Sequence, residues 1–117
     1  MRALVIGGTA FIGPYVVRDL LHKGIEVLLF NRGKRLAGGI KEVRTILGDR
    51  NCIGDFRSEL LNFKPDIVID MIPLYERHAA ILCDMFKGVG NRIVAISSMD
   101  VYRAYGRMTG LEPGHAE

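Results

Sequence analysis

The sequence predicts an α/β fold with a doubly wound parallel sheet. Short apolar runs that suit strands buried on both faces alternate along the chain with segments of helical periodicity. Strands and helices in alternation form right-handed crossover units, whose helices cover both faces of a parallel sheet. A chain of 117 residues has the length of one domain. We therefore treat residues 1–117 as a single domain.

The first predicted element is a buried strand that runs directly into a glycine turn. Ala3 to Ile6 is entirely apolar, and Gly7-Gly8 follows it. A helix is expected from Gly13 to Lys23, ended by Gly24 as its C′ residue. The apolar stripe of this helix consists of Val16, Val17, Leu20 and Leu21.

The remaining elements continue the alternation. We expect strands over Glu26–Asn31, Val43–Leu47, Asp66–Ile72 and Arg92–Ser97, and helices from Asp55 or Arg57 to Phe63 and from Leu74 to Lys87. In a Rossmann-type sheet the five strands would take the order 3-2-1-4-5, whereas the complete doubly wound fold has about six strands. We therefore expect a sheet that is incomplete at its C-terminal side, and a chain that is the N-terminal part of a longer protein.

Composition places the chain among globular proteins and argues against several functions. It is 49% hydrophobic and 25% charged, with a net charge of +3 that suits an anionic ligand. The sequence lacks the concentrated basic stripe of nucleic-acid binders, and no apolar run has the length of a membrane span. We expect no membrane partner, a cytoplasmic location and self-association through an open sheet edge. Cys52 and Cys83 belong to no Cys/His cluster, so we expect reduced core thiols and no metal site.

The glycine turn after the first strand predicts a site for a phosphate anion. The pattern Gly7-x-x-Ala10-x-x-Gly13 lies between a strand and a helix, where free N–H groups and the helix dipole attract negative charge. It is a variant of the dinucleotide fingerprint, and a purely structural turn is the alternative. The cofactor contacts expected from this segment are Gly7, Thr9, Ala10, Phe11, Ile12 and Gly13.

The end of the second strand bears on which dinucleotide is bound. An acidic residue there would accept hydrogen bonds from the adenosine ribose, whereas an Arg favours a 2′-phosphate. This chain carries Asn31-Arg32 and then Lys34 and Arg35. We therefore expect NADP in preference to NAD, with Asn31, Arg32 and Arg35 as contacts. The alternative is a solvated basic loop.

Several segments, in order, resemble one family. They are G-G-T-A-F-I-G (7–13), F-N-R-G (30–33), G-D-R (48–50) and S-S-M-D-V-Y (97–102). Together they resemble the extended and atypical short-chain dehydrogenase/reductase superfamily, and more closely its NAD-dependent epimerase/dehydratase family, with isoflavone-reductase-like and chloroplast stem-loop-binding-like relatives. Ala10 departs from the pattern, in which Gly or, in the atypical branch, Arg is commoner.

The resemblance implies further site residues. Asp49 would meet the adenine amino group together with the backbone of Arg50, although Asp49 could equally hydrogen-bond its own turn. Ser98 takes the place of the family's catalytic Ser/Thr, which orients the substrate. The other positions implied to lie near the cofactor are Met71, Ile72 and Ser97. For Asp70 we expect a half-buried carboxylate paired with an Arg or a helix N-terminus.

The superfamily's general acid/base, the Tyr of Y-x-x-x-K, is missing from this sequence. The four tyrosines without a Lys at that spacing are Tyr15, Tyr75, Tyr102 and Tyr105, and the three histidines expected at the surface are His22, His78 and His115. One hypothesis is that the chain is part of an NAD(P)-dependent epimerase, dehydratase or reductase. Such an enzyme transfers hydride to or from a hydroxyl- or carbonyl-bearing substrate. Its Tyr–Lys pair would then lie beyond Glu117, and this chain alone would be inactive. The other is a non-catalytic dinucleotide-binding module, either a redox sensor or an RNA-binding relative.

Overall fold

The structure is a computed structural model that describes residues 1–7, 12–33, 43–88 and 92–96. Its elements are β1 (Arg2–Ile6), α1 (Gly13–His22), β2 (Glu26–Asn31), β3 (Arg44–Leu47), the 3₁₀ helix η1 (Arg50–Phe56), α2 (Arg57–Asn62), β4 (Ile67–Asp70), α3 (Glu76–Met85) and β5 (Arg92–Ala95). The strands form one parallel sheet in the order β3-β2-β1-β4-β5. The predicted fold class and strand order are confirmed.

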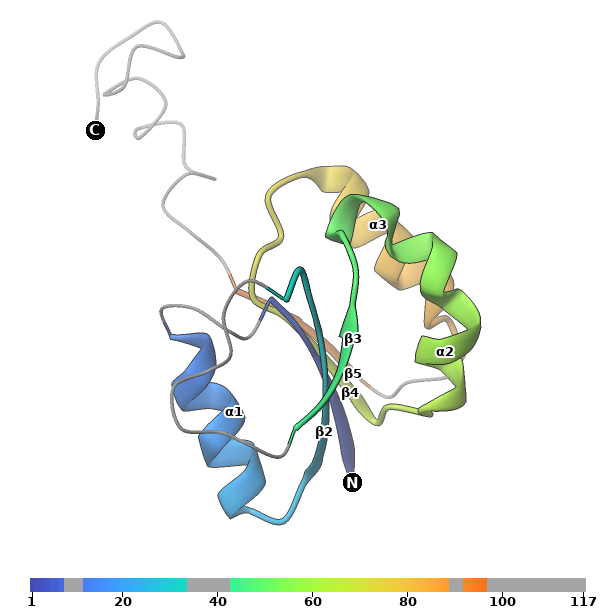
Figure 1. The fold of residues 1–117 in the computed structure, drawn as a ribbon. Coiled ribbons are helices and arrows are strands. Elements are labelled where there is room, and N and C mark those ends of the chain that lie inside the picture. Colours follow the sequence, from blue (N-terminus) through green and yellow to red (C-terminus); the bar gives the residue numbers. More distant parts are fainter. Residues whose placement is uncertain (8–11, 34–42, 89–91, 97–117) are drawn as a thin grey trace, which may run out of the picture.

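The sheet changes direction at β1, which pairs with β2 on one side and β4 on the other. Ile6 at the end of β1 lies opposite both Phe30 and Asp70. The chain leaves β1 toward β2 through α1, and returns from β3 to β4 through η1 and α2. Helix α1 covers one face of the sheet while α2 and α3 cover the other (Figure 1). Right-handed crossovers that lead away from β1 in both directions produce this arrangement. The carboxyl ends of all strands therefore meet at one edge, with the switch point between β1 and β4.

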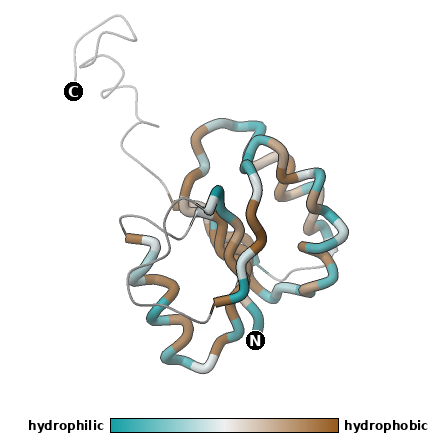
Figure 2. Tube along the Cα trace, in the orientation of Figure 1, coloured by the Kyte–Doolittle hydropathy of each residue, from teal (hydrophilic) through white to brown (hydrophobic). Residues whose placement is uncertain are grey.

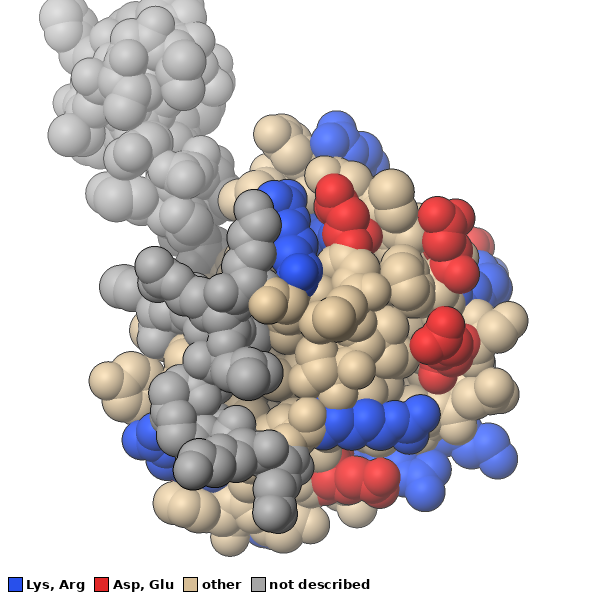
Figure 3. All heavy atoms as spheres, in the orientation of Figure 1, with Lys and Arg blue, Asp and Glu red and all other residues tan. Residues whose placement is uncertain are grey.

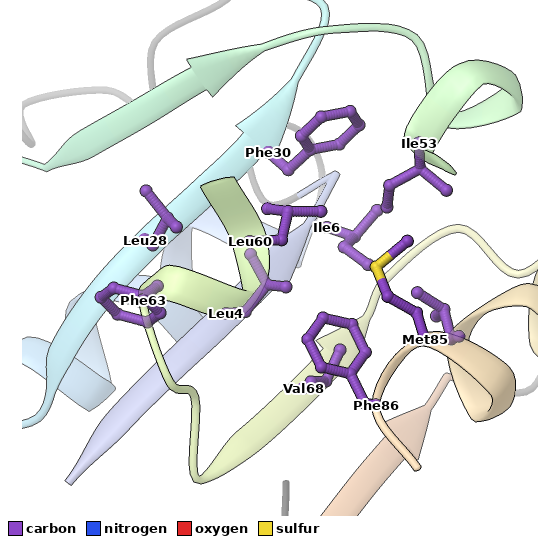
Figure 4. Close-up of a cluster of buried hydrophobic side chains, with 11 residues drawn as sticks. Leu4, Ile6, Leu28, Phe30, Ile53, Leu60, Phe63, Val68, Met85 and Phe86 are labelled. Atoms are coloured by element: carbon purple, nitrogen blue, oxygen red, sulfur yellow. The ribbon is translucent and has the colours of Figure 1, made fainter. Parts of the chain in front are cut away.

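Alternating side chains on the strands divide the core into two clusters. Val5 faces α1, in a cluster that includes Val17 and Ile69. Leu4 and Ile6 face η1, α2 and α3, in the larger cluster drawn in Figure 4. Its other buried members are Leu28, Phe30, Ile53, Leu60, Phe63, Val68, Leu82, Met85 and Phe86. Both faces of the central strands are covered, which is why they are hydrophobic along their length (Figure 2).

Helix α1 ends as its sequence predicts. Gly24 has a φ of +76°, and its N–H donates to the carbonyl of Leu21 at 3.0 Å, while the N–H of Ile25 donates to Leu20 at 3.1 Å. This pair of bonds is a Schellman motif with glycine at C′. At the other end Pro14 occupies the first turn, and within the described residues no side chain caps the helix.

The thiols differ from the prediction of core positions. Cys52 and Cys83 are both free and exposed. Cys52 lies at the non-helical kink inside η1, with φ −112° and ψ 21°. Cys83 lies on α3 beside the buried stripe formed by His78, Leu82 and Met85, which follow helical spacing and leave position 83 facing outward.

The described surface carries charges of both signs. On the face drawn in Figure 3, acidic and basic side chains of the described residues are interspersed, and the basic ones form no continuous stripe. Within the described residues, no helix is long and apolar enough to cross a membrane.

Candidate functional site

Gly7 begins the turn at the carboxyl end of β1. Its φ is +76°, which disfavours any residue with a Cβ. Its N–H donates to the carbonyl of Phe30 at 2.9 Å, and a Cβ built on it would lie 2.8 Å from Cγ1 of Ile72. The position thus favours glycine for two reasons: its backbone has a positive φ, and a Cβ would collide with the Ile72 side chain after β4. Ile12 and Gly13 lie at the start of α1, whereas Thr9, Ala10 and Phe11 lie outside the described residues.

Asn31 ends β2 as a buried amide, only 8% exposed. Its Oδ1 accepts the N–H of Gly33 at 2.6 Å, and its carbonyl accepts the N–H of Gly48 at 2.8 Å. Its Nδ2 is buried and has no partner among the described residues. Since buried donors are nearly always paired, this amide is a candidate donor to a ligand. Arg32 is exposed beside it, and Arg35 lies outside the described residues.

Asp49 and Arg50 follow β3 and have different roles. The Oδ1 of Asp49 accepts the N–H of Asn51 at 2.8 Å, so this carboxylate caps η1. The guanidinium of Arg50 is buried and pairs with Asp70: Nη1 donates to Oδ1 at 2.5 Å and Nη2 donates to Oδ2. The expected pairing of Asp70 with an Arg is confirmed, but the carboxylate is fully buried rather than half-buried.

The end of β4 is tied to the neighbouring strands. The N–H of Met71 donates to the carbonyl of Ile6, and the N–H of Ile96 donates to the carbonyl of Asp70, both at 3.0 Å. The N–H of Ile72 donates to Oδ1 of Asp70 at 3.1 Å, and the Ile72 side chain is 39% exposed. The chain therefore brings Met71 and Ile72 to the same edge as Gly7. Ser97 and Ser98 lie outside the described residues.

His78 corrects the prediction of surface histidines, because it is only 4% exposed. Its Nδ1 accepts the N–H of Leu74 at 3.2 Å, so Nε2 carries the proton and donates to Oδ1 of Asn51 at 3.1 Å. Burial lowers the pKa of His78, and the charges of Arg50 and Arg77 lower it further, against a smaller opposing effect of Asp70. Position 78 lies one helical turn before Leu82 on the buried stripe of α3, and this spacing could have predicted the burial of His78 from the sequence. His22 is exposed as expected, and His115 lies outside the described residues.

A hollow of about 400 Å³ opens between η1 and the first turns of α3. Both elements follow the carboxyl ends of strands, β3 and β4, so the hollow lies at the ligand edge of the sheet. Its lining residues are Arg50, Asn51, Arg77, His78, Ala80 and Ile81. The residues of α3 among them were not predicted from the sequence. No group of three metal-ligating side chains occurs in the part of the chain that the structure describes.

A family comparison matches this arrangement. The model of the NAD dependent epimerase/dehydratase family matches residues 3–86, from β1 into the turn after α3. The chain belongs to this family. The resemblance expected from the motifs is confirmed, and the matched span includes Gly7, Asn31, Asp49 and the β4 end. No curated protein matches this epimerase/dehydratase family chain.

Solved structures share the fold of this family member at low sequence identity. The Bordetella bronchiseptica enzyme WbmG in complex with NAD matches with a TM-score of 0.67 and 17% identity, over 81% of this chain and 36% of WbmG. The Thermus thermophilus UDP-glucose 4-epimerase complex with NAD matches with a TM-score of 0.60 and 22% identity, over 76% and 35%. A short chain dehydrogenase family protein from Francisella tularensis matches with a TM-score of 0.69 and 16% identity, over 86% and 52%. The chain thus spans about a third to half of these proteins.

Proposed function

We propose that this chain is the dinucleotide-binding part of an NAD(P)-dependent epimerase, dehydratase or reductase. The observation that carries the proposal is that Gly7 and Asn31 directly follow Ile6 and Phe30, which lie opposite each other at the ends of β1 and β2. The turn at Gly7 has a bare backbone because a Cβ there would meet Ile72, and the buried Nδ2 of Asn31 has no partner among the described residues. Both features fit a dinucleotide, and both follow strands whose carboxyl ends bind ligands in open α/β sheets. The NAD named in the WbmG and Thermus thermophilus complexes supports the same cofactor class.

The pyrophosphate would lie at the turn between β1 and α1. The first N–H groups of α1 have no side-chain cap among the described residues, and the helix dipole favours an anion there. Gly7, Ile12 and Gly13 are the described residues of this subsite. Thr9, Ala10 and Phe11 complete it in the proposal.

The adenosine ribose would lie beside Asn31 and Arg32. The Asn31 amide is held by the N–H of Gly33, which fixes Oδ1 as the acceptor and leaves Nδ2 as the donor. A donor in this place suits phosphate oxygens better than the ribose hydroxyl donors that an acidic residue would accept. Together with Arg32 and Arg35, it favours NADP over NAD.

The adenine would lie toward η1 and the hollow beside α3. Asp49 uses Oδ1 to cap η1, which leaves Oδ2 for an adenine amino group. Arg50 contributes its backbone here, since its side chain is paired with Asp70. Met71 and Ile72 would lie beside the ribose on the nicotinamide side of the cofactor.

The nicotinamide supplies hydride chemistry when bound, and the protein supplies position and electrostatics. Ser98, and Ser97 beside it, follow β5 in the sequence, where Ser98 would orient the substrate hydroxyl or carbonyl. A hydroxyl can assist, but proton transfer needs an activated acid/base. Because no Tyr of the chain has a Lys at the Y-x-x-x-K spacing, the chain by itself is proposed to bind cofactor without turnover.

Calorimetric titration of the purified chain with NADPH and with NADH tests the proposal. We expect both to bind and NADPH to bind more tightly. The Arg32→Ala variant should lose affinity for NADPH while retaining NADH binding, whereas Lys87→Ala, an exposed charge after α3, should change neither. Tighter binding of NADH would contradict the NADP preference, and failure to bind either would contradict the proposed function.

The absent Y-x-x-x-K supports a second candidate, a non-catalytic dinucleotide-binding module such as a redox sensor or an RNA-binding relative. A filter-binding assay with a single-stranded RNA over a salt series tests the RNA-binding form of this module. Affinity that falls steeply with salt supports the RNA-binding relative. The mixed charges of the face in Figure 3 lead us to expect weak binding.

A further inference from the structure

One buried carboxylate joins the two ends of the proposed cofactor site. The two oxygens of Asp70 receive Nη1 and Nη2 of Arg50, and Oδ1 also accepts the N–H of Ile72 at 3.1 Å. Arg50 begins η1 directly after Asp49, while Ile72 lies against Gly7. Asp70 thus links the adenine side of the site with the phosphate turn.

Stability alone does not account for this pair. The side chains of Arg50 and Asp70 are 5% and 1% exposed, and the Nε of Arg50 is buried without a partner among the described residues. Removing both charges from water costs much of what their attraction returns, and apolar replacements of similar size are often neutral or stabilising. An unpartnered N–H adds to the cost of the pair. The pair therefore calls for a role other than holding the fold together.

The geometry of the pair indicates what that role is. Asp49 and Arg50 follow β3 at one edge of the sheet, while Asp70 ends β4 across β2 and β1. No backbone ladder joins β3 to β4, so the guanidinium bridges a separation that the sheet does not. A bidentate pair fixes distance and orientation together, since two parallel N–H···O bonds hold the planar guanidinium against the planar carboxylate.

We infer that Asp70 and Arg50 are positioning residues for the dinucleotide. The pair sets the loop after β3 at a fixed distance from Ile72, and through Ile72 from Gly7. The adenine and pyrophosphate subsites are thereby held at the spacing that one dinucleotide spans. This inference rests on the proposed function, because it assigns the pair to the same site.

The test separates positioning from stability with the double variant Arg50→Met/Asp70→Leu in the full chain. We expect a melting temperature close to that of the wild type, and NADPH and NADH affinities that fall by about tenfold or more. The matched control is Arg57→Met/Asp84→Leu, which removes an exposed ion pair of 3.6 Å between α2 and α3. This control should leave both dinucleotide affinities unchanged.

The possible results are distinct. If the wild type binds and the double variant binds within about twofold of it, the inference is overturned while the proposed function stands. If the wild type binds neither dinucleotide, both are overturned.

Should the double variant fail to fold, Arg50→Lys keeps the charge and loses the bidentate fork. We expect this variant to fold, to bind both dinucleotides more weakly, and to show faster hydrogen exchange at the Ile72 amide. Unchanged affinity and unchanged exchange in Arg50→Lys would overturn the inference.

Discussion

His78 donates its Nε2 proton to Oδ1 of Asn51 at 3.1 Å, and this bond joins α3 to η1 between two residues that line the hollow. The bond requires a neutral imidazole, because Nδ1 accepts the N–H of Leu74. A second proton would turn Nδ1 into a donor that faces another donor. The contact is therefore sensitive to pH in a direction that the structure fixes.

We predict that acid weakens the fold through His78. Burial and the charges of Arg50 and Arg77 lower the pKa of the folded state below the ordinary value of 6.5. Between the two pKa values the unfolded chain binds more protons than the folded one, so stability rises with pH in that window. The contribution is fully present above about pH 6.5 and is lost as the pH falls through the folded pKa. Urea unfolding from pH 5 to pH 8 measures it.

The matched variants are His78→Gln and His22→Gln. His78→Gln should flatten the stability profile between pH 5 and pH 6.5, whereas His22→Gln, at an exposed position, should leave it unchanged. Equal slopes for the wild type and His78→Gln would contradict the assignment.

A second prediction concerns Gly7. Alanine there must adopt a φ of +76°, and its Cβ would lie 2.8 Å from Cγ1 of Ile72. We expect Gly7→Ala to lose about 1–3 kcal/mol of unfolding free energy and to abolish measurable dinucleotide binding. Thermal unfolding and NADPH titration measure the two effects.

Gly24→Ala is the control, because its φ is also +76° but nothing lies within 4 Å of its Cβ. It should destabilise the chain by about 1 kcal/mol and leave the intrinsic affinity intact. Wild-type affinity in Gly7→Ala would refute the phosphate subsite.

A third prediction concerns the choice between NADP and NAD. Asn31→Asp keeps an oxygen for the N–H of Gly33 and replaces Nδ2, which has no partner in the described part of the chain, with a second acceptor. A carboxylate accepts ribose hydroxyls and repels a 2′-phosphate, so the affinity ratio should shift toward NADH by about tenfold. Asn62→Asp adds the same charge at an exposed position on α2 and should leave the ratio unchanged. An unaltered ratio in Asn31→Asp would remove Asn31 from the specificity site.

The sequence predicts those parts of the fold that depend on local pattern. The run from Ala3 to Ile6 is apolar because β1 is covered on both faces, and Gly24 is a glycine because α1 ends in the left-handed region. The strand order follows from the fold type, and the turn at Gly7 from its place between strand and helix. These features need only neighbours in sequence.

The features that the sequence did not predict depend on distant partners. The η1 segment R-N-C-I-G-D-F has no helical period, and it is held by the Asp49 cap and the burial of Ile53. The buried His78 imidazole is hydrogen-bonded to Asn51, which lies 27 positions away in the sequence. For Asp70 an Arg partner could be expected, but the choice of Arg50 depends on the way β3 and β4 flank β2 and β1.

The last prediction concerns Lys64, where the end of α2 departs from sequence preference. Lys64 has a φ of +52°, and its N–H donates to the carbonyl of Leu61 at 3.0 Å. A left-handed residue with a Cβ costs roughly 1–2 kcal/mol, and glycine avoids this cost while losing more chain entropy on folding. We therefore expect Lys64→Gly to raise the free energy of unfolding by about 0.5–1 kcal/mol, measured by urea titration. The matched control is Lys87→Gly after α3, where the positive φ already belongs to Gly88. That variant has no strain to relieve and should be neutral or destabilising, so an equal loss of stability in both variants would show that Lys64 is not strained.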